Sequence, residues 1–162
     1  FFFFFSILCI RQMQNVEKAI KAGFESRFNW NFLPNFKTEM AVAYTYTEDL
    51  NTQKPLPEIY PLDFRWKVED EFSPVILGLK YRFAAKQKRV AEDFGEKITP
   101  DFSVFDFSAK YNVFQNAFLN LEISNIFDRA YAEHLNRALS NNKNQRILER
   151  GRSFNLGFSW SF

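Results

Sequence analysis

The sequence has little of what most catalytic and metal sites are built from. Its single cysteine, Cys9, excludes an intrachain disulfide, and its single histidine, His134, belongs to no cluster of cysteines and histidines that could bind a metal. No serine stands with His134 in a pattern typical of a nucleophile and its base. We therefore predict no enzyme activity, no catalytic or metal-binding residues and no cofactor. We interpret His134 as a loop residue, with a contact to a substrate or metal as the alternative.

Charge of one sign and long apolar runs are also missing. The net charge is +2, which is too balanced to indicate a nucleic acid partner. No apolar run approaches the roughly 18 residues of a membrane-spanning helix, and the mean hydropathy is −0.32. Yet the chain holds 22 phenylalanines, and aromatic residues make up 19% of it. The apolar residues must therefore be dispersed along the chain by a regular pattern.

That pattern is clearest at the end of the chain, where residues 152–162 read RSFNLGFSWSF. Every second residue from Phe154 to Phe162 is large and apolar, and the residues between them are small or polar. A period of two is typical of a β-strand with one apolar and one polar face. Upstream segments repeat it, and we predict seven strands, at residues 19–32, 36–47, 62–69, 74–83, 101–111, 117–125 and 152–162.

The connections between these strands alternate between short turns and long loops. The long loops are residues 48–61, with three prolines, residues 84–100, which are charged, and residues 127–151, where 130–139 is predicted to form one or two helical turns. A meander whose long loops all fall at one end is typical of outer-membrane barrels. We predict an all-β fold: an antiparallel up-and-down transmembrane β-barrel segment of seven, or eight, strands in contact with outer-membrane lipid.

Aromatic residues are placed as a membrane barrel requires, since such barrels carry aromatic girdles at both membrane interfaces. A soluble barrel or sandwich is the alternative, because it shows the same alternation with its apolar face inward. The one-sided loop lengths and the many phenylalanines favour the membrane barrel. The predicted girdles are Trp30, Phe32, Phe36, Tyr111, Trp160 and Phe162 at the short-turn end, and Tyr44, Tyr46, Tyr81 and Phe83 at the long-loop end.

The polar faces of the strands carry charges of both signs. An eight-stranded barrel has room only for packed side chains, so these charges favour a wider lumen, of which the seven strands are an incomplete part. Two interpretations stay open: cross-strand ion pairs, or guidance of an anionic ferric chelate by Arg65, Lys67, Lys80 and Arg82. The predicted lumen-facing residues are Lys21, Glu25, Arg27, Lys37, Glu39, Asp63, Arg65, Lys67, Glu69, Lys80, Arg82, Asp106, Lys110 and Glu122.

Residues 1–13 do not follow the alternation. Phe1 to Phe5 and the following SILCI are similar to the apolar core of a signal peptide, without a basic start or a cleavage site. Three interpretations are open: a signal remnant, a chain that starts within a longer one, and an eighth strand. We divide the chain into residues 1–13, left unassigned, and residues 14–162, the barrel part.

Two segments near the end resemble the C-terminus of TonB-dependent outer-membrane receptors: NIFDRAYAEHLNR at residues 125–137 and RGRSFNLGFSWSF at residues 150–162. In that family an N-L-F-D-x-x-Y segment ends the penultimate strand, and P-G-R opens a last strand that ends in Phe. This chain departs from the family pattern at the proline, since Glu149 and Arg150 precede Gly151 here. Residues 14–25, 55–66 and 86–106 are also similar to the family. The motif residues are Asn125, Phe127, Asp128, Tyr131, Gly151 and Arg152.

The resemblance implies a 22-stranded barrel in the outer membrane of a Gram-negative bacterium, preceded by a plug that engages TonB. It implies active transport of a ferric siderophore or similar metal chelate, and recognition of Phe162 by the barrel-assembly machinery. The chain contains neither plug nor TonB box, so we expect it not to transport alone. A small eight-stranded structural or adhesive barrel, and a truncated product without activity, are the alternatives.

Overall fold

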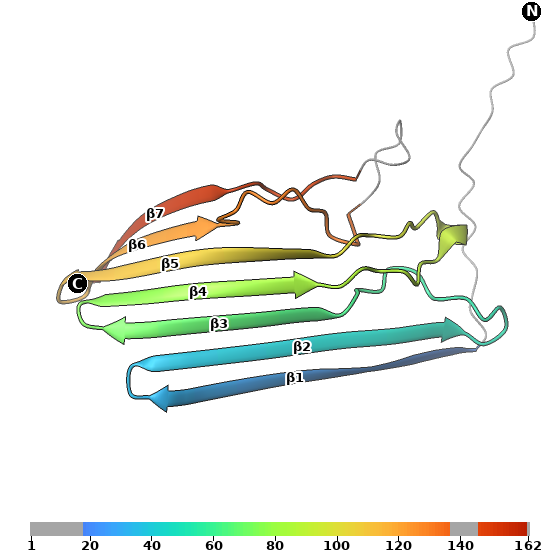
Figure 1. Cartoon of the computed structure of the whole chain (residues 1–162), viewed down its shortest axis with the longest axis horizontal. Helices are drawn as coiled ribbons and strands as arrows, with labels where there is room; N and C mark the ends of the chain where they lie inside the picture. Colours follow the sequence, from blue (N-terminus) through green and yellow to red (C-terminus); the bar gives the residue numbers. More distant parts are fainter. Residues whose placement is uncertain (1–17, 137–145, 162) are drawn as a thin grey trace, which may run out of the picture.

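The computed structural model describes residues 18–136 and 146–161, which form one antiparallel sheet. Its seven strands lie in chain order, each hydrogen-bonded to the next (Figure 1). This up-and-down meander confirms the predicted all-β class and strand order. The strands are β1 (Ala19–Leu33), β2 (Phe36–Asp49), β3 (Asp63–Phe72), β4 (Val75–Ala84), β5 (Phe102–Phe114), β6 (Ala117–Ser124) and β7 (Ser153–Trp160). The predictions for residues 1–13 and for Phe162 lie outside the described residues.

Several strands end elsewhere than predicted. β3 runs on to Phe72 because its pairing with β4 continues through Asp70 and Glu71, where the alternation is lost. β5 continues to Phe114 past an irregularity in its pairing with β6. β7 is shorter than predicted, from Ser153 to Trp160. Strand ends are thus set by backbone pairing with the neighbouring strand, which the alternation of side chains does not report.

The long loops contain little regular structure. The helical turns predicted for residues 130–139 are absent from the described part, 130–136, which makes one tight backbone turn between Glu133 and Asn136. Elsewhere in the described residues a single 3-10 turn, η1 (Glu92–Phe94), lies in the loop after β4, where no helix is predicted. In the described residues no helix has the length and apolar character needed to cross a membrane.

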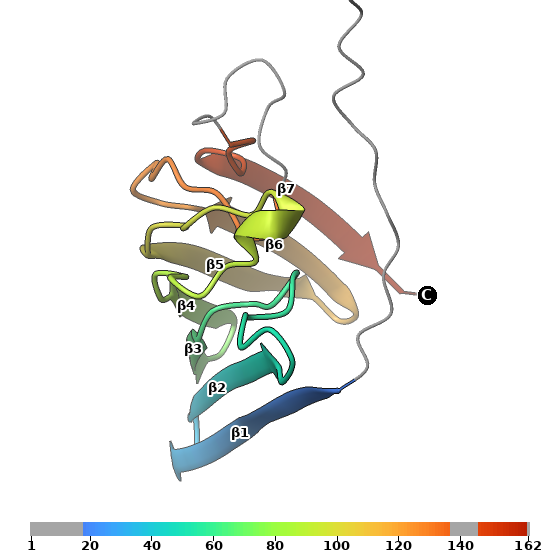
Figure 2. The same ribbon diagram turned by 90° about the vertical axis from the view of Figure 1, so that its right-hand side faces the viewer.

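The sheet curves across its strands, with a convex and a concave face (Figure 2). The apolar set of each strand lies on one face, where paired strands place Met40 opposite Trp66 and Leu79 opposite Phe107. Large apolar side chains on this face stay exposed in the described chain, up to 73% for Leu156. A soluble sandwich would bury such residues, so their exposure favours a lipid-facing surface.

One polar residue, Thr38, lies among the apolar side chains of β2. It is only 7% exposed. Its hydroxyl accepts a hydrogen bond from the Trp66 indole Nε1 at 2.8 Å and donates one to the Lys67 carbonyl at 3.3 Å. A polar group that faces lipid must find its partners within the protein. The Thr38 hydroxyl and the Trp66 indole N–H therefore both have hydrogen-bond partners within the protein, and neither leaves an unpaired polar group on the apolar face.

Candidate functional site

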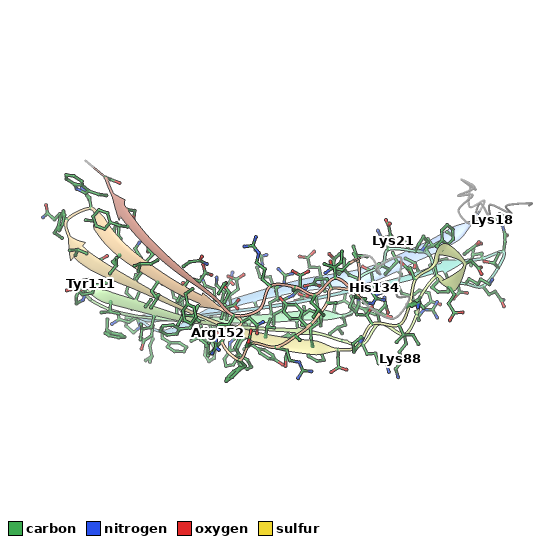
Figure 3. The ribbon with its side chains drawn as sticks, turned by 90° about the horizontal axis from the view of Figure 1, so that it is seen from above. Lys18, Lys21, Lys88, Tyr111, His134 and Arg152 are labelled. Carbon is green, nitrogen blue, oxygen red and sulfur yellow. The ribbon has the colours of Figure 1, made fainter. Side chains whose placement is uncertain are left out.

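The charged face of the sheet is a network of ion pairs. Lys21, labelled in Figure 3, projects to the concave side. Most of the paired groups are more than a third exposed, so each pair contributes less than about 1 kcal/mol. Cross-strand pairing, one of the two interpretations of the sequence, thus describes most of these charges. The pairs are Arg27–Glu39 at 3.5 Å, Lys37–Glu71 at 3.4 Å, Lys67–Glu69 at 2.8 Å, Lys80–Glu122 at 3.4 Å and Asp63–Arg65 at 2.7 Å.

Asp106 and Lys110, also predicted to face the lumen, have other partners. The Asp106 carboxylate accepts a hydrogen bond from the backbone N–H of Asn125 at 2.8 Å, which fixes the end of β6. The Lys110 ammonium lies 3.7 Å from the centre of the Phe118 ring. Glu25 shares the alternation of Lys21 and is exposed. A role of these residues toward a substrate stays a prediction.

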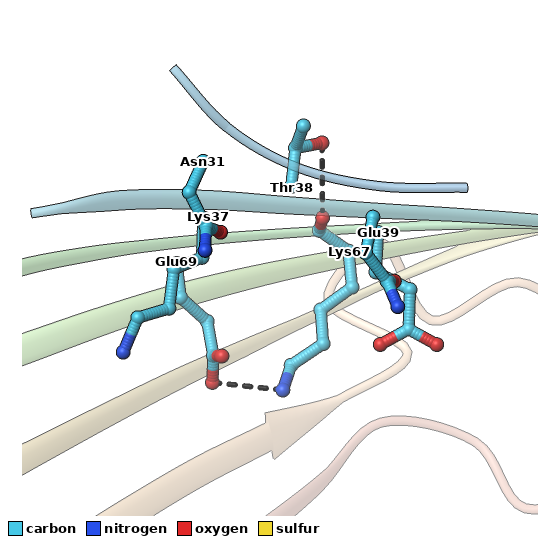
Figure 4. Close-up of a pocket in the computed structure, with 7 residues that line it drawn as sticks. Asn31, Lys37, Thr38, Glu39, Lys67 and Glu69 are labelled. Atoms are coloured by element: carbon cyan, nitrogen blue, oxygen red, sulfur yellow. Dashed lines mark hydrogen bonds and ion pairs between the residues drawn. The ribbon is translucent and has the colours of Figure 1, made fainter. Parts of the chain in front are cut away.

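A shallow polar depression opens between β1, β2 and β3 near the short-turn end. Figure 4 shows Lys67 reaching the Glu69 carboxylate there, at 2.8 Å. The depression measures about 180 Å³ and is open to solvent. Its amide, ammonium and carboxylate groups suit small hydrated ions better than an apolar ligand. The lining residues are Asn29, Asn31, Lys37, Thr38, Glu39, Lys67 and Glu69.

Arg82 on β4 is the centre of the least exposed part of the network. Its Nε donates to Asp63 at 2.7 Å, and its two terminal nitrogens donate to the Glu133 carboxylate at 2.5 and 3.2 Å. The three side chains are 25%, 14% and 17% exposed. Glu133 belongs to the loop after β6, so this bidentate pair fastens that loop to the barrel wall. We name Arg82, Asp63 and Glu133 the wall clasp.

Tyr131 supports the wall clasp from the same loop. Its ring packs on Phe102 with 4.3 Å between ring centres, and the Arg82 guanidinium lies 5.4 Å from the centre of the same Phe102 ring. Phe102 belongs to the buried cluster of the described chain, together with Ala84 and Val104. Tyr131, the tyrosine of the family motif, therefore covers the small buried cluster of Ala84, Phe102 and Val104. Burial raises the pKa of its hydroxyl, and Glu149 adds to this effect.

Of the four residues considered for guiding an anionic chelate, each already has a carboxylate partner. Arg65 and Arg82 share Asp63, Lys67 binds Glu69, and Lys80 binds Glu122. An anionic ligand would have to displace these carboxylates. Glu133, which joins the loop to Arg82, carries no signal in the sequence beyond its place beside His134.

Asn125, the first residue of the family motif, closes the loop after β6 at its base. It has a positive φ of 51° and is 4% exposed. Its side-chain oxygen accepts from the Arg129 N–H at 2.9 Å, and its amide nitrogen donates to the carbonyls of Arg129 at 2.9 Å and Arg150 at 3.4 Å. One side chain therefore ties the outgoing limb of the loop to its returning limb. Asparagine suits this place because it tolerates positive φ.

Asp128, Gly151 and Arg152 complete the closure. The Asp128 Oδ1 accepts the backbone N–H of Arg152 at 2.8 Å, one residue before β7 begins. A Cβ on Gly151 would lie 2.6 Å from that same oxygen, so the glycine leaves room for the carboxylate. Phe127 points elsewhere, being 74% exposed with its ring edge-on to Phe105 at 5.6 Å. The hydrogen bonds of Asn125 and Asp128 to Arg150 and Arg152 thus hold the end of β6 beside the start of β7.

We expect Asn125→Ala to lower the free energy of unfolding of the full-length protein by about 2 kcal/mol, because it removes the loop closure and adds a strained positive φ. Asn125→Gly removes the same hydrogen bonds and relaxes the φ, so it is expected to cost about 1 kcal/mol less than the alanine variant. Urea unfolding in lipid vesicles measures both values. Equal losses in the two variants would contradict a role for the backbone conformation.

His134 lies in the same loop, between β6 and β7, and is only 5% exposed. Its Nδ1 and the Thr99 hydroxyl form a hydrogen bond at 2.7 Å, which docks the loop after β6 on the loop after β4. Its Nε2 has no hydrogen-bond partner among the described residues and lies 3.9 Å from the Glu96 carboxylate. Burial lowers the pKa of His134, Glu96 counteracts this and Arg146 adds to it. Among the described residues no group of three or more His, Cys, Asp or Glu could hold a metal ion.

Glu96 also joins the loop after β2 to the contact between His134 and Thr99. Its carboxylate accepts backbone N–H groups from Glu58 at 2.5 Å and from Ala91 at 2.9 Å. Lys54 of the loop after β2 also binds Asp93 at 2.6 Å, and this hydrogen bond raises the pKa of Lys54. The loops after β2, β4 and β6 are therefore joined to one another at the long-loop end of the sheet. Nothing in the sequence distinguishes Glu96 from the other acidic residues of its loop.

Acid is expected to loosen the contact of His134 with Thr99. A histidine in an opened loop titrates near the ordinary pKa of about 6.5, and the docked His134 has a lower pKa. Docking is then fully present above about pH 6.5 and weakens as the pH falls below it. The protection factors of amide hydrogen exchange at residues 96–99 and 131–136, which are corrected for the intrinsic slowing of exchange in acid, should fall between pH 7.5 and 5. His134→Gln, which stays neutral, should lose this pH dependence; persistence of the same dependence would exclude His134 as its source.

Comparisons with known proteins bear on the whole sheet. The copper transporter OprC is similar to the chain with a TM-score of 0.83 and 30% sequence identity, over 89% of this chain and 24% of that one. The FrpB iron transporter from Neisseria meningitidis gives a TM-score of 0.69 at 19% identity, over 89% and 23% of the two chains. The ferric yersiniabactin uptake receptor FyuA from Yersinia pestis gives 0.72 at 14%, over 89% and 24%.

The chain thus spans about a quarter of the length of each of these proteins. At 19% and 14% identity, the likeness to FrpB and FyuA shows a shared fold alone, whereas the likeness to OprC combines the fold with 30% sequence identity. No family model matches the chain, and no curated protein matches it either.

Proposed function

We propose, from the premise that this chain is the C-terminal barrel portion of a TonB-dependent outer-membrane receptor, that it forms part of the wall of an importer for a metal chelate. One observation carries the proposal: a meander with an apolar and a charged face that superposes on OprC with a TM-score of 0.83 at 30% identity. The wall alone holds no complete binding site. The plug, the remaining strands and the contact with TonB belong to the full-length protein.

The substrate class we propose is a ferric siderophore or a similar metal chelate. The similar proteins are a copper transporter, an iron transporter and a ferric yersiniabactin uptake receptor. The charged face suits a hydrated, charged cargo, since its ammonium, guanidinium and carboxylate groups line a polar path past the wall clasp. An anionic chelate that reaches Arg82 or Arg65 would compete with Asp63 and Glu133 for them. We propose Arg65, Lys67, Lys80 and Arg82 as the wall residues that meet it.

Uptake of radiolabelled metal in a Gram-negative host tests this function. Cells with the full-length receptor should accumulate one labelled iron or copper chelate, and a strain without TonB or treated with a protonophore should lose the accumulation. Cells with only this chain should show none. Accumulation that persists without TonB would exclude an energised importer, and no accumulation of any chelate by cells with the assembled full-length receptor would favour a structural barrel.

We also propose that Phe162 is read by the barrel-assembly machinery. The supporting feature is the alternation that places it on the apolar set of Phe158 and Trp160. Deletion of Phe162 is expected to reduce the amount of folded receptor in the outer membrane, with little change in total synthesis. Heat-modifiability on gels measures the folded fraction. Phe162→Trp, which keeps an aromatic residue at this position, should retain assembly; equal assembly of the deletion variant would contradict the proposal.

A further inference from the structure

Two arginines face each other on the concave side of the sheet. Arg65 on β3 lies directly opposite Arg82 on β4 in the strand register. Arg65 is also paired with Ala41 on β2 and, through it, with Arg27 on β1. Arg27 shares its alternation with Lys21, which Figure 3 shows on the concave side. Like charges directly opposite each other on one face of a sheet repel, so the two arginines need anionic partners.

One carboxylate serves the inner nitrogens of both arginines. Asp63 accepts a hydrogen bond from the Nε of Arg65 through Oδ1 and one from the Nε of Arg82 through Oδ2, each at 2.7 Å. This leaves the terminal nitrogens of both guanidinium groups for other partners. Two such nitrogens form a planar fork that matches the two oxygens of a carboxylate. The pair of arginines thus offers two forks, one on each strand.

The two forks differ in what they bind. Glu133, from the loop after β6, fills the fork of Arg82 by accepting from both terminal nitrogens. Within residues 18–136 and 146–161 the terminal nitrogens of Arg65 donate no hydrogen bond, and the side chain is 64% exposed. The charges of the two guanidinium and two carboxylate groups cancel, and without Glu133 they leave one positive charge. Glu133 therefore occupies a position that suits the carboxylate of another molecule.

Glu133 and Asp63 are held in different ways. Asp63 is part of β3, whereas Glu133 reaches the wall from a loop segment outside any strand. A tethered group competes for its site like a free ligand at an effective concentration of about a millimolar. A single free carboxylate must overcome this competition at Arg82 alone. A molecule with two carboxylates binds the open fork of Arg65 first, and its second carboxylate then competes with Glu133 as a tethered group itself.

We propose that Glu133 is a specificity-determining residue of the importer, an internal competitor that occupies the position of one carboxylate of the cargo. The inference rests on the proposed function and deepens it, because it narrows the cargo to a metal chelate with at least two free carboxylates. The first free carboxylate binds Arg65, and the second displaces Glu133 from Arg82. Asp63 remains bound to both arginines, so only the contact of the loop with the wall is exchanged.

Equilibrium dialysis of radiolabelled succinate against the full-length protein in a non-ionic detergent tests the proposal. Succinate carries two carboxylates, and sodium chloride keeps the ionic strength constant. Glu133→Gln removes a charge-assisted competitor, so it should bind succinate roughly tenfold to a hundredfold more tightly than the unchanged protein. Adding Arg65→Gln to Glu133→Gln should remove this gain. The matched control, Glu71→Gln, removes an exposed carboxylate that binds Lys37 on the same face, and it should leave the affinity within about twofold.

Hydrogen exchange provides a second readout, because displacement of Glu133 must loosen its loop. Saturating succinate should lower the protection of residues 131–136 in the unchanged protein, and acetate at the same concentration of carboxylate groups should have a much smaller effect. Equal affinities of Glu133→Gln and the unchanged protein would overturn the proposal. A gain of the same size in Glu71→Gln would also overturn it, since binding would then follow net charge. So would bound succinate that leaves the protection unchanged, since the anion would then lie elsewhere.

Uptake of metal chelates is measured separately from succinate binding. If the receptor imports a chelate and Glu133→Gln binds succinate no more tightly than the unchanged protein, the transport proposal stands and the role of Glu133 is wrong. If Glu133→Gln shows the expected gain and no chelate is imported, the two-arginine site stands and the importer is wrong.

Discussion

Replacing Arg82 with methionine is expected to lower the free energy of unfolding of the full-length protein by about 3 kcal/mol. The methionine side chain is also unbranched, but it lacks the guanidinium, which lies 5.4 Å from the centre of the Phe102 ring and binds Asp63 and Glu133. Those two carboxylates are 14% and 17% exposed, so Glu133 loses its partner in a place where water reaches it poorly. Urea unfolding in lipid vesicles measures the loss.

Arg65→Met is the matched control for the wall clasp. Arg65 lies on the neighbouring strand and binds the same Asp63 at 2.7 Å, but its side chain is 64% exposed, and no ion pair or hydrogen bond joins it to the described part of the loop after β6. We expect a loss of less than about 1 kcal/mol. Limited proteolysis separates the two further, because only Arg82→Met should speed cleavage in residues 127–151. Equal effects of the two variants would show that Arg82 has no special role in holding the loop.

Gly23→Ala is expected to cost about 3 kcal/mol, the upper part of the range for overpacked sites. A Cβ at Gly23 would lie 2.4 Å from the carbonyl oxygen of Tyr44 and 3.2 Å from the Cα of Thr45. Both atoms belong to the backbone of β2, which is paired with β1 over almost its whole length, so neither can move alone. The same unfolding measurement applies, and the proportion of receptor that folds in the outer membrane should also fall.

Gly78→Ala provides the comparison for Gly23. Its Cβ would lie 2.4 Å from the Ser108 hydroxyl oxygen, yet that atom is on a side chain and can rotate away. We expect a loss of less than about 1 kcal/mol. A loss at Gly78 as large as that at Gly23 would contradict the distinction between a clash with fixed backbone atoms and a clash with a hydroxyl that can rotate.

The alternation predicted the sheet well because lipid and water impose it. A strand between the two must place its apolar residues on one side, so the period of two in residues 101–111 or 152–162 reports the fold directly. Phe102 and Val104 break the rule, since they lie on the charged face. They are apolar because Tyr131 covers them, and no local pattern reveals a residue 27 or 29 positions away as the cover.

The candidate site was predicted less completely for a related reason. The sequence indicates which charges share a face, but pairing depends on register and on loops that fold back. Register joins Lys37 to Glu71, which lies beyond the predicted end of its strand. Loop folding joins Arg82 to Glu133 and His134 to Thr99. The motif residues Asn125 and Asp128 were found by resemblance, and their hydrogen bonds supply the physical reason for the pattern.

The two-faced sheet also limits how the length of the protein can drift in evolution. One residue inserted in β3 ahead of Trp66 would turn Trp66 and Val68 toward the charged face and Lys67 and Glu69 toward lipid. Each charge moved to the middle of the bilayer costs about 2–4 kcal/mol for a lysine. Insertions and deletions should therefore accumulate in the long loops and be purged from the strands, except in pairs that restore the parity. We therefore expect relatives with different cargoes to share their strand lengths and to differ in the lengths of their loops.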